Sequence, residues 1–326
     1  MTRVLLVGAG AVGARAARQL VEADDVDEVV VVDPSAARRA AVVHSSGAKA
    51  TDGGSVDHHD IDGVLLAGPN GTHADAARRH VALGRPVVSC ADGVDDVYDL
   101  LALGPEATGA DVPVLVGAGF SPGYTCVLTR HAAATFEAVE EIHVARSGTG
   151  GPACARAHHA ALTGMAVDWR DGEWLHRRAG SGRELCWFPD PIGSEDCYRA
   201  ALPDALLLVP AFPDARRVTA RLAATRRDRI SAHLPMLRKP HPEGLVGAVR
   251  VEVRGTRGGV QDVAVLGALD RPAVASGAVA ALALRWALRG RLPVGASGLA
   301  VLDDTVGFLS ELAVVGIKAA AFAGSG

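Results

Sequence analysis

The first 120 residues alternate between short apolar runs and longer stretches whose apolar positions have helical spacing. Within the apolar runs there is no alternation with polar residues, which is typical of strands covered on both faces. The predicted strands span 3–7, 28–33, 49–51, 63–67, 86–90 and 112–117, and the predicted helices span 12–23, 35–46, 73–83 and 94–103. This βαβ repetition predicts an α/β domain with a doubly wound parallel sheet.

The pattern changes after residue 140, where strand-like runs are separated by turn signals. Asp171-Gly172, between Trp169 and Trp174, indicates a tight hairpin turn, and a second hairpin is predicted over 249–266. The other predicted strands span 141–146, 166–169, 174–178, 185–188 and 217–224, and helices are predicted over 153–162, 192–201, 272–289 and 303–322. We expect a first domain over 1–125, an α+β domain with a mostly antiparallel sheet over 126–270, and closing helices over 271–326 that return to the first domain.

A glycine-rich turn, Gly8-Ala9-Gly10-Ala11-Val12-Gly13, lies between the first predicted strand and the first predicted helix. In this context Gly8 permits the tight turn, Gly10 leaves space for a pyrophosphate, and Gly13 lets helix and strand pack closely. The N–H groups at the helix start would face the phosphates. The spacing predicts a Rossmann dinucleotide site with contacts from Gly8, Gly10, Ala11, Val12 and Gly13.

Asp33 ends the second predicted strand, 20 residues after Gly13. With Pro34 beside it in the cofactor site, its carboxylate would accept hydrogen bonds from the adenosine ribose, which favours NAD. Arg38 and Arg39 follow closely and leave NADP open, because an arginine at this place accepts a 2′-phosphate. We therefore expect NAD, with NADP as the alternative.

Three further strand ends carry residues that would line the nicotinamide side, because ligands of a doubly wound sheet lie across the carboxyl ends of its strands. The alternative is purely structural: a turn at Pro69-Asn70-Gly71, helix caps at Thr72 and Asp92, a core position for Cys90, and a helix start at Ser121-Pro122. The candidate cofactor contacts are Gly68, Pro69, Asn70, His73, Cys90, Gly119 and Phe120.

Substrate-binding and proton-transferring residues are expected in the loops beyond these strands. An acidic group of a small substrate would be bound by Ser121, Arg156 and Arg183. The proton would be transferred by Tyr124, His158 or His159. Exposed positions on a helix are the alternative for the two histidines, and their adjacency argues against a metal pair, so no metal is expected. The three lysines, Lys49, Lys239 and Lys318, lie away from these strand ends.

The composition narrows the function classes. The chain has 326 residues, of which 49% are hydrophobic and 21% charged, and its net charge is −4. These values describe an ordinary globular protein and argue against a nucleic-acid or anionic-membrane surface. Five cysteines without a C-x-x-C pair indicate reduced thiols. The first predicted strand begins at residue 3, which leaves no room for a signal peptide, so we expect a cytoplasmic protein.

The chain resembles the saccharopine-dehydrogenase-like branch of Rossmann oxidoreductases. The resemblance rests on the glycine turn, on Val87-Val88-Ser89 and above all on Gly119-Phe120-Ser121-Pro122-Gly123. The region 180–193 and the closing helices are weakly similar to short bacterial members. This family implies NAD(P)-linked redox chemistry, often at an amine or imine carbon of an amino-acid-like substrate.

A second resemblance is to the glucose–fructose-oxidoreductase-like family. It rests on Pro69-Asn70-Gly71-Thr72-His73 and on the segment 82–88. That family follows with Glu-Lys-Pro, whose lysine takes part in catalysis, whereas Cys90-Ala91-Asp92 stands here. The sugar-oxidation mechanism of that family therefore does not carry over.

These observations predict an NAD(P)-dependent oxidoreductase that transfers a hydride between nicotinamide and an imine, amine or carbonyl carbon of a small, acidic, amino-acid-like substrate. Two alternatives stay open. One is a non-redox lyase or cyclase that recycles bound NAD, and the other is a non-catalytic dinucleotide sensor, against which the large second domain argues. The antiparallel sheet of that domain predicts a homodimer, and neither nucleic acid nor a membrane is expected as a partner.

Overall fold

The computed structural model describes residues 1–47, 49–53, 60–236 and 239–322. The chain divides into two compact units. Unit 1 comprises residues 1–119 and 273–299, and unit 2 comprises residues 120–272 and 300–326. Among the described residues, no helix combines the length and the apolar character that a membrane span requires.

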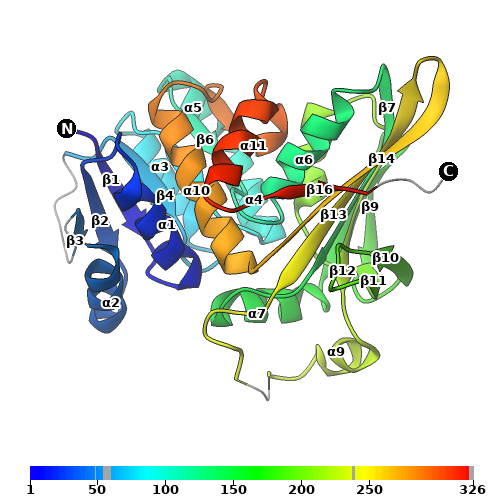
Figure 1. Ribbon diagram of the computed structural model, residues 1–326, viewed down its shortest axis with the longest axis horizontal. Helices are drawn as coiled ribbons and strands as arrows, with labels where there is room; N and C mark the ends of the chain where they lie inside the picture. The colour runs from blue at the N-terminus through cyan, green and yellow to red at the C-terminus, as the bar shows by residue number, and fades with distance from the viewer. Residues whose placement is uncertain (48, 54–59, 237–238, 323–326) are drawn as a thin grey trace. The chain divides into compact units, whose positions relative to one another are not determined.

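Unit 1 is built on a seven-stranded parallel sheet with the strand order β15-β6-β5-β4-β1-β2-β3 (Figure 1). Its strands are β1 (Arg3–Val7), β2 (Glu28–Val32), β3 (Ala50–Asp52), β4 (Gly63–Leu66), β5 (Val87–Ser89), β6 (Pro113–Leu115) and β15 (Gly295–Ser297). The central strands are apolar on both faces, since Val4, Leu5 and Leu6 are at most 1% exposed. The predicted α/β fold with a parallel sheet is confirmed.

The helices of unit 1 connect these strands. They are α1 (Ala11–Glu22), α2 (Ala36–Ser46), α3 (His73–Val81), α4 (Val94–Leu101), α5 (Gly104–Gly109) and α10 (Pro272–Leu288), the last of which belongs to unit 1 from Ala273 onward. Two ion pairs tie the end of α10 to the loop between α1 and β2: Arg285 Nε and Arg289 NH2 each lie 2.7 Å from the Asp25 carboxylate. The late segment 273–299 adds a helix and the edge strand β15 to unit 1.

Unit 2 is built on a nine-stranded mixed sheet with the path β10-β11-β12-β7-β13-β14-β16, and β8 pairs with both β12 and β9. The strands are β7 (Ala138–Ser147), β8 (Met165–Arg170), β9 (Glu173–Arg178), β10 (Glu184–Trp187), β11 (Ser194–Arg199), β12 (Arg217–Ala223), β13 (Gly247–Arg257), β14 (Val260–Asp270) and β16 (Ala319–Ala321). Over the described part of the chain, β12 and β7 pair in parallel and the other pairs are antiparallel. The predicted mostly antiparallel second sheet is confirmed.

The helices of unit 2 are α6 (Tyr124–Ala133), α7 (Pro152–Ala161), α8 (Asp204–Leu208), α9 (Arg226–Ser231) and α11 (Thr305–Val314), with short 3-10 turns at Val209–Ala211 and Leu299–Val301. One face of the sheet is apolar: Ile142, Val144 and Val251 are at most 1% exposed, and α6 packs against β7, β13 and β14. On the other face the register places His143 beside both Thr219 and Glu252. The two faces of this sheet therefore differ, because polar side chains are buried or half-buried on only one of these two stretches of it.

Two predicted helices in this unit need correction. The prediction of a helix over 192–201 is wrong, because β11 forms there and pairs with β10 and β12. Pairing with distant strands, which buries Cys197 completely, overrides the local pattern. The helix predicted over 303–322 ends at Val314, and Gly316 with a φ of 93° precedes β16, which pairs with β14. Residues 300–326 accordingly belong to unit 2.

Candidate dinucleotide site and neighbouring polar clusters

The turn between β1 and α1 has the backbone geometry that the glycine motif predicts. Gly8 has a φ of 111°, which favours glycine, and its N–H donates to the carbonyl of Val32 at 2.7 Å. A Cβ added at Gly13 would lie 1.8 Å from the carbonyl oxygen of Gly8, so no larger residue fits without a backbone shift. These two glycines let α1 begin directly against the end of β1.

Gly10 has a different environment. It is exposed, and a Cβ added there would meet no heavy atom of the described chain within 4 Å. It is also the N-cap of α1 and makes no side-chain cap. The first N–H groups of a helix lack intrahelical acceptors and attract anions, so the space at Gly10 and the N–H groups of Ala11, Val12 and Gly13 fit a pyrophosphate.

Asp33 connects the end of β2 to this turn. Its Oδ2 accepts a hydrogen bond from the Ala9 N–H at 2.9 Å, and its Oδ1 accepts one from the Ser35 N–H at 2.8 Å and one from Arg38 NH2 at 2.7 Å. Burial alone would raise the pKa of Asp33, but the hydrogen bonds from Arg38, Ser35 and Ala9 hold the pKa below its usual value. Asp33 is therefore a carboxylate at neutral pH, as the recognition of a ribose requires, and Pro34 continues the chain beside it.

The two arginines after Asp33 have different roles. The Arg39 side chain is 16% exposed and donates to the Asp33 carbonyl oxygen at 2.5 Å and to Asp52 Oδ1 at 2.6 Å. The Arg38 side chain is 57% exposed and pairs with the Asp33 carboxylate. Arg38 is thus the arginine that can turn toward a cofactor phosphate, whereas Arg39 braces the backbone.

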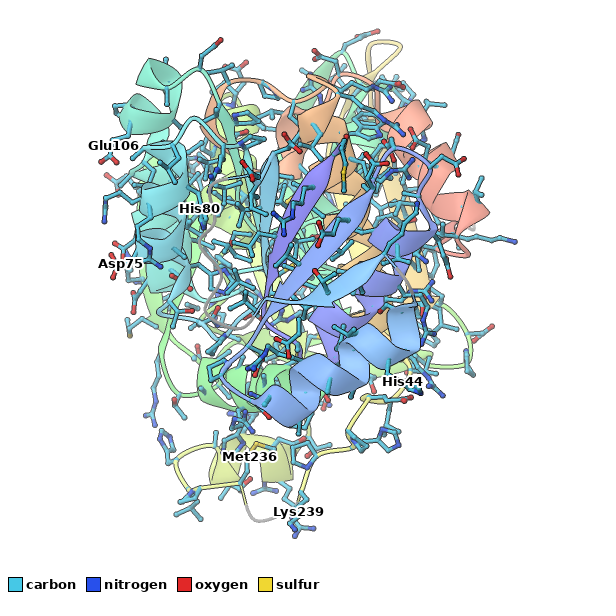
Figure 2. All side chains as sticks on the ribbon, turned by 90° about the vertical axis from the view of Figure 1, so that its left-hand side faces the viewer. His44, Asp75, His80, Glu106, Met236 and Lys239 are labelled. Atoms are coloured by element: carbon cyan, nitrogen blue, oxygen red, sulfur yellow. The ribbon has the colours of Figure 1, made fainter. Side chains whose placement is uncertain are left out.

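The loops after β4 and β5 are connected to each other by side chains. Asn70 Nδ2 donates to Asp92 Oδ1 at 2.9 Å, and the Asp92 N–H donates back to Asn70 Oδ1 at 3.3 Å. The Gly71 N–H donates to Asp96 Oδ2 at 2.9 Å. A pocket of about 350 Å³ lies beside this connection, and it is lined by Asn70, Gly71, Ala74, Asp75, Gly93, Val94, Asp95, Asp96 and Asp99. Asp75 lies at the outer surface of α3 (Figure 2).

The other predicted cofactor residues at these strand ends are held by backbone and side-chain contacts. His73 is 1% exposed, and its ring nitrogens lie 2.8 Å from Ser89 Oγ and 2.9 Å from the Gly68 carbonyl oxygen. Cys90 Sγ lies 3.7 Å from the Ala118 carbonyl oxygen, and the Gly119 N–H donates to the Gly117 carbonyl at 2.9 Å. Pro69 is exposed. Direct contacts of these residues with a cofactor stay predictions.

The Phe120–Tyr124 segment of unit 2 is anchored by buried charged groups. The Ser121 hydroxyl donates to Asp204 Oδ1 at 3.0 Å, and Arg146 NH1 donates to the Ser121 carbonyl at 2.6 Å. Phe120 stacks against Tyr124 with ring centroids 6.2 Å apart. Ser121 is thus held at its side chain and at its backbone, and its role as a substrate contact stays a prediction.

Tyr124 and Asp204 each carry an oxygen that is fully buried. Within the described residues, neither the Tyr124 hydroxyl nor Asp204 Oδ2 has a hydrogen-bond partner. Burial raises the pKa of both groups well above their usual values, and for Asp204 the charge of Arg146 and the hydroxyls of Ser121 and Thr125 oppose the rise. Tyr124 therefore keeps its proton at neutral pH, and buried oxygens of this kind call for an explanation in water or ligand chemistry.

The remaining candidates lie on α7 and before β10. His158 and His159 are partly exposed on α7, and His159 Nε2 lies 2.8 Å from the Leu234 carbonyl oxygen, to which it donates. Arg156 is exposed on the same helix. Arg183 pairs with Asp196 of β11 at 2.8 Å, so a substrate carboxylate would have to compete with Asp196. The structure brings Phe120, Ser121 and Tyr124 together in one segment, whereas Arg183 is engaged elsewhere in the sheet.

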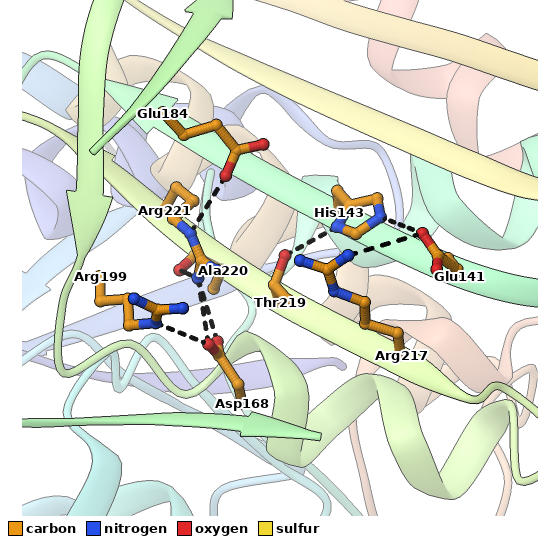
Figure 3. A network of polar contacts seen from close by, with 9 residues as sticks. All are labelled: Glu141, His143, Asp168, Glu184, Arg199, Arg217, Thr219, Ala220 and Arg221. Carbon is orange, nitrogen blue, oxygen red and sulfur yellow. Dashed lines mark hydrogen bonds and ion pairs between the residues drawn. The ribbon is translucent and has the colours of Figure 1, made fainter. Parts of the chain in front are cut away.

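The polar face of the unit 2 sheet carries two charged clusters, which Figure 3 shows. In one, Arg221 NH1 contacts Asp168 Oδ1 at 3.1 Å, with Arg199 and Glu184 completing the cluster. In the other, His143 bridges Thr219 at 2.8 Å and Glu141 at 2.9 Å. Arg221 is 4% and Asp168 6% exposed, so this first cluster is a buried ion-pair network.

Ser89, Arg146 and Asp204 are residues that sequence reasoning missed. Ser89 was within reach, because it is the polar residue that ends an otherwise apolar strand. Arg146 and Asp204 gave no local signal, because their contacts with Ser121 join residues that are 25 and 83 positions apart.

Comparisons with known proteins agree with this geometry. Residues 2–90 match the GFO/IDH/MocA oxidoreductase family in its NAD-binding Rossmann fold. The rhizopine catabolism protein MocA of Rhizobium meliloti is 36% identical over 88 residues, which are 26% of this chain and 27% of that protein. The match thus spans about a quarter of the curated relative. Residues 2–90 are therefore similar to the NAD-binding Rossmann domain of that oxidoreductase family.

Two solved structures resemble nearly the whole chain in fold. Saccharopine dehydrogenase (L-Glu forming) from Saccharomyces cerevisiae has a TM-score of 0.69 at 15% identity, covering 99% of this chain and 100% of that one. The DAP dehydrogenase of C. glutamicum in complex with DAP has a TM-score of 0.52 at 16% identity, covering 92% and 93%. At these identities the likeness concerns the fold, and it agrees with the resemblance to saccharopine-dehydrogenase-like oxidoreductases.

Proposed function

We propose that this protein is an NAD(P)-dependent dehydrogenase or reductase that acts on an amine, imine or carbonyl carbon of a small, acidic, amino-acid-like substrate. The main support for this proposal is the open space at Gly10 together with the ionised Asp33 at the end of β2. The bound nicotinamide would supply the hydride chemistry, and the protein would supply orientation and electrostatics.

The substrate class is supported by the kinds of dehydrogenase that share the fold. The two structures compared above are a saccharopine dehydrogenase described as L-Glu forming and a DAP dehydrogenase in complex with DAP. In this chain Arg156 is the exposed arginine of α7 that could bind a carboxylate, and the buried Tyr124 hydroxyl is a candidate proton donor. His158 and His159 stay as further proton-transfer candidates.

The cofactor part of the proposal is tested by calorimetric titration with NAD and NADP. We expect NAD to bind more tightly, because Asp33 prefers ribose hydroxyls to a 2′-phosphate. Arg38→Ala should weaken NADP binding about tenfold and leave NAD binding nearly unchanged, since Arg38 is the more exposed arginine of the two. Tighter binding of NADP than of NAD by the unaltered protein would contradict the assignment.

The redox part is tested by NADH absorbance with a panel of amino acids, keto acids with ammonia, and polyols. Net formation or consumption of NADH with an acidic amino acid supports the proposal. Tyr124→Phe should then lower turnover about 100-fold with cofactor affinity unchanged. Bound NAD with substrate conversion but no net absorbance change would favour a lyase or cyclase instead.

The predicted homodimer is part of the same proposal. β14, which lies beside the edge strand β16 of the unit 2 sheet, exposes apolar side chains: Val260 is 65% and Val263 49% exposed. Sedimentation at several protein concentrations measures the association, and a concentration-independent monomer would contradict it.

A further inference from the structure

We propose that His73 and Ser89 are positioning residues of the cofactor site, which hold the loops after β4 and β5 in the arrangement that accepts the nicotinamide half of the dinucleotide. This inference rests on the proposed function, because it concerns the same cofactor. It assigns to His73 a role inside the protein, in place of the direct contact that the sequence predicts.

The hydrogen bonds around His73 form a directed chain. The Gly68 carbonyl oxygen can only accept, so His73 Nε2 carries the proton and donates to it at 2.9 Å. In the neutral ring Nδ1 then accepts from the Ser89 hydroxyl at 2.8 Å. The Ser89 Oγ in turn accepts from the Ala91 N–H at 3.1 Å. Each group in the chain has the partner that its chemistry demands.

The chain is fully inside unit 1 and joins two neighbouring strand ends. His73 is 1% and Ser89 0% exposed. Leu66 and Ser89 are register partners on β4 and β5, so Gly68 and Ala91 stand just beyond adjacent strands. The Asn70–Asp92 pair and the bond from Gly71 to Asp96 add further links between the same two loops. His73 and Ser89 are the most deeply buried members of this connection.

The position of the brace relative to the sheet indicates which half of the cofactor it serves. Neighbouring strands follow the order β5-β4-β1-β2. The glycine turn follows β1 and Asp33 follows β2, so the pyrophosphate and the adenosine ribose lie over these two strands. The other half of a dinucleotide that crosses the sheet then lies over β4 and β5. The brace therefore acts on the nicotinamide end of the cofactor.

Comparing the affinities of two ligands distinguishes this role from a general effect of the substitution on the domain. NADH carries both halves of the cofactor, whereas ADP-ribose lacks the nicotinamide. We expect His73→Ala to raise the Kd of NADH about tenfold and to change the Kd of ADP-ribose less than about twofold. Ser89→Ala should have the same selectivity with a smaller effect, because the bond from His73 to Gly68 remains.

Matched variants complete the calorimetric experiment. His80 is a second buried histidine on α3, 7% exposed and at the opposite end of the helix, where its Nδ1 lies 3.4 Å from Arg85 NH1 (Figure 2). His80→Ala should leave the NADH to ADP-ribose affinity ratio unchanged. His73→Gln, which keeps a terminal N–H donor, should recover part of the lost NADH affinity.

The outcomes distinguish this inference from the proposed function. Selective loss of NADH affinity in both His73→Ala and Ser89→Ala supports the brace. An equal loss of affinity for NADH and ADP-ribose overturns the brace, and so does an unchanged affinity for both ligands in His73→Ala and Ser89→Ala. Either outcome leaves the dehydrogenase proposal intact. An unaltered protein that binds neither NADH nor ADP-ribose overturns the proposed function and the brace with it.

Discussion

The sheet of unit 1 is apolar on both faces, whereas the sheet of unit 2 buries apolar side chains on one face and both charged and apolar side chains on the other. In unit 1, Val29, Val30 and Val31 of β2 are at most 1% exposed. In unit 2, Arg221 and Asp168 are nearly as buried as these valines, at 4% and 6%. The first sheet is stabilised by the close packing of apolar side chains. The second sheet depends in addition on buried charges that must be paired with opposite charges.

The same contrast applies to the functional residues. The candidate dinucleotide site of unit 1 consists mostly of backbone N–H groups and open space, with Asp33 as its charged group. The candidate residues of unit 2 are side chains held by other side chains, as Arg146 and Asp204 hold Ser121. Substitutions should therefore damage the two units in different ways.

The largest effect is expected in the buried network of unit 2. Asp168→Ala leaves the guanidinium of Arg221 buried without its main partner, and the free energy of unfolding should fall by about 3–5 kcal/mol. Denaturant titration measures the change. Combining Asp168→Leu with Arg221→Met should recover most of it, because no uncompensated charge stays buried.

An exposed ion pair of the same unit provides the control. Glu243 and Arg271 lie 3.0 Å apart with side chains 70% and 51% exposed. Glu243→Ala should cost at most about 1 kcal/mol. Equal effects of Asp168→Ala and Glu243→Ala would refute the distinction between buried and exposed charge in this sheet.

The next largest effect is expected in the glycine turn of unit 1. Gly13→Ala places a Cβ against the Gly8 carbonyl, and the free energy of unfolding should fall by about 1–3 kcal/mol. Gly10→Val adds its side chain to open space, so thermal unfolding should hardly change while NAD affinity falls at least about tenfold. A Gly10→Val variant that binds NAD normally would remove the pyrophosphate assignment.

The smallest expected effect concerns pH and has opposite signs in the two units. The pKa of Asp33 is lowered in the folded protein, so its contribution to stability is present above the unfolded pKa of 3.8 and is lost as the pH falls. The pKa of Asp204 is raised, so stability falls as the pH rises from 3.8 through the folded pKa. Unfolding curves from acid to neutral pH should therefore change in opposite directions in Asp33→Asn and Asp204→Asn. Parallel changes in the two variants would contradict the assigned pKa directions.

Much of unit 1 could be predicted from local sequence. The parallel strands, the turn from Gly8 to Gly13 and Asp33 follow from spacing along the chain, because each feature needs only its immediate neighbours. The edge strand β15 could not be predicted, since Gly295–Ser297 is a short segment that becomes a strand by pairing with β6. The prediction of a helix over 192–201 was wrong for a related reason, because strand pairing overrode the local pattern.

The amino-acid sequence by itself determined the Rossmann fold and indicated the candidate dinucleotide site, because a glycine turn, a helix start and an acid act through local geometry. Only the tertiary structure decided which polar side chains form hydrogen bonds inside the protein. The His73 ring pairs with Ser89 and the Ser121 hydroxyl with Asp204, and all four residues are buried. Each of these contacts satisfies a polar group with a partner distant in sequence, and burial makes such satisfaction obligatory without leaving a mark on the residues nearby.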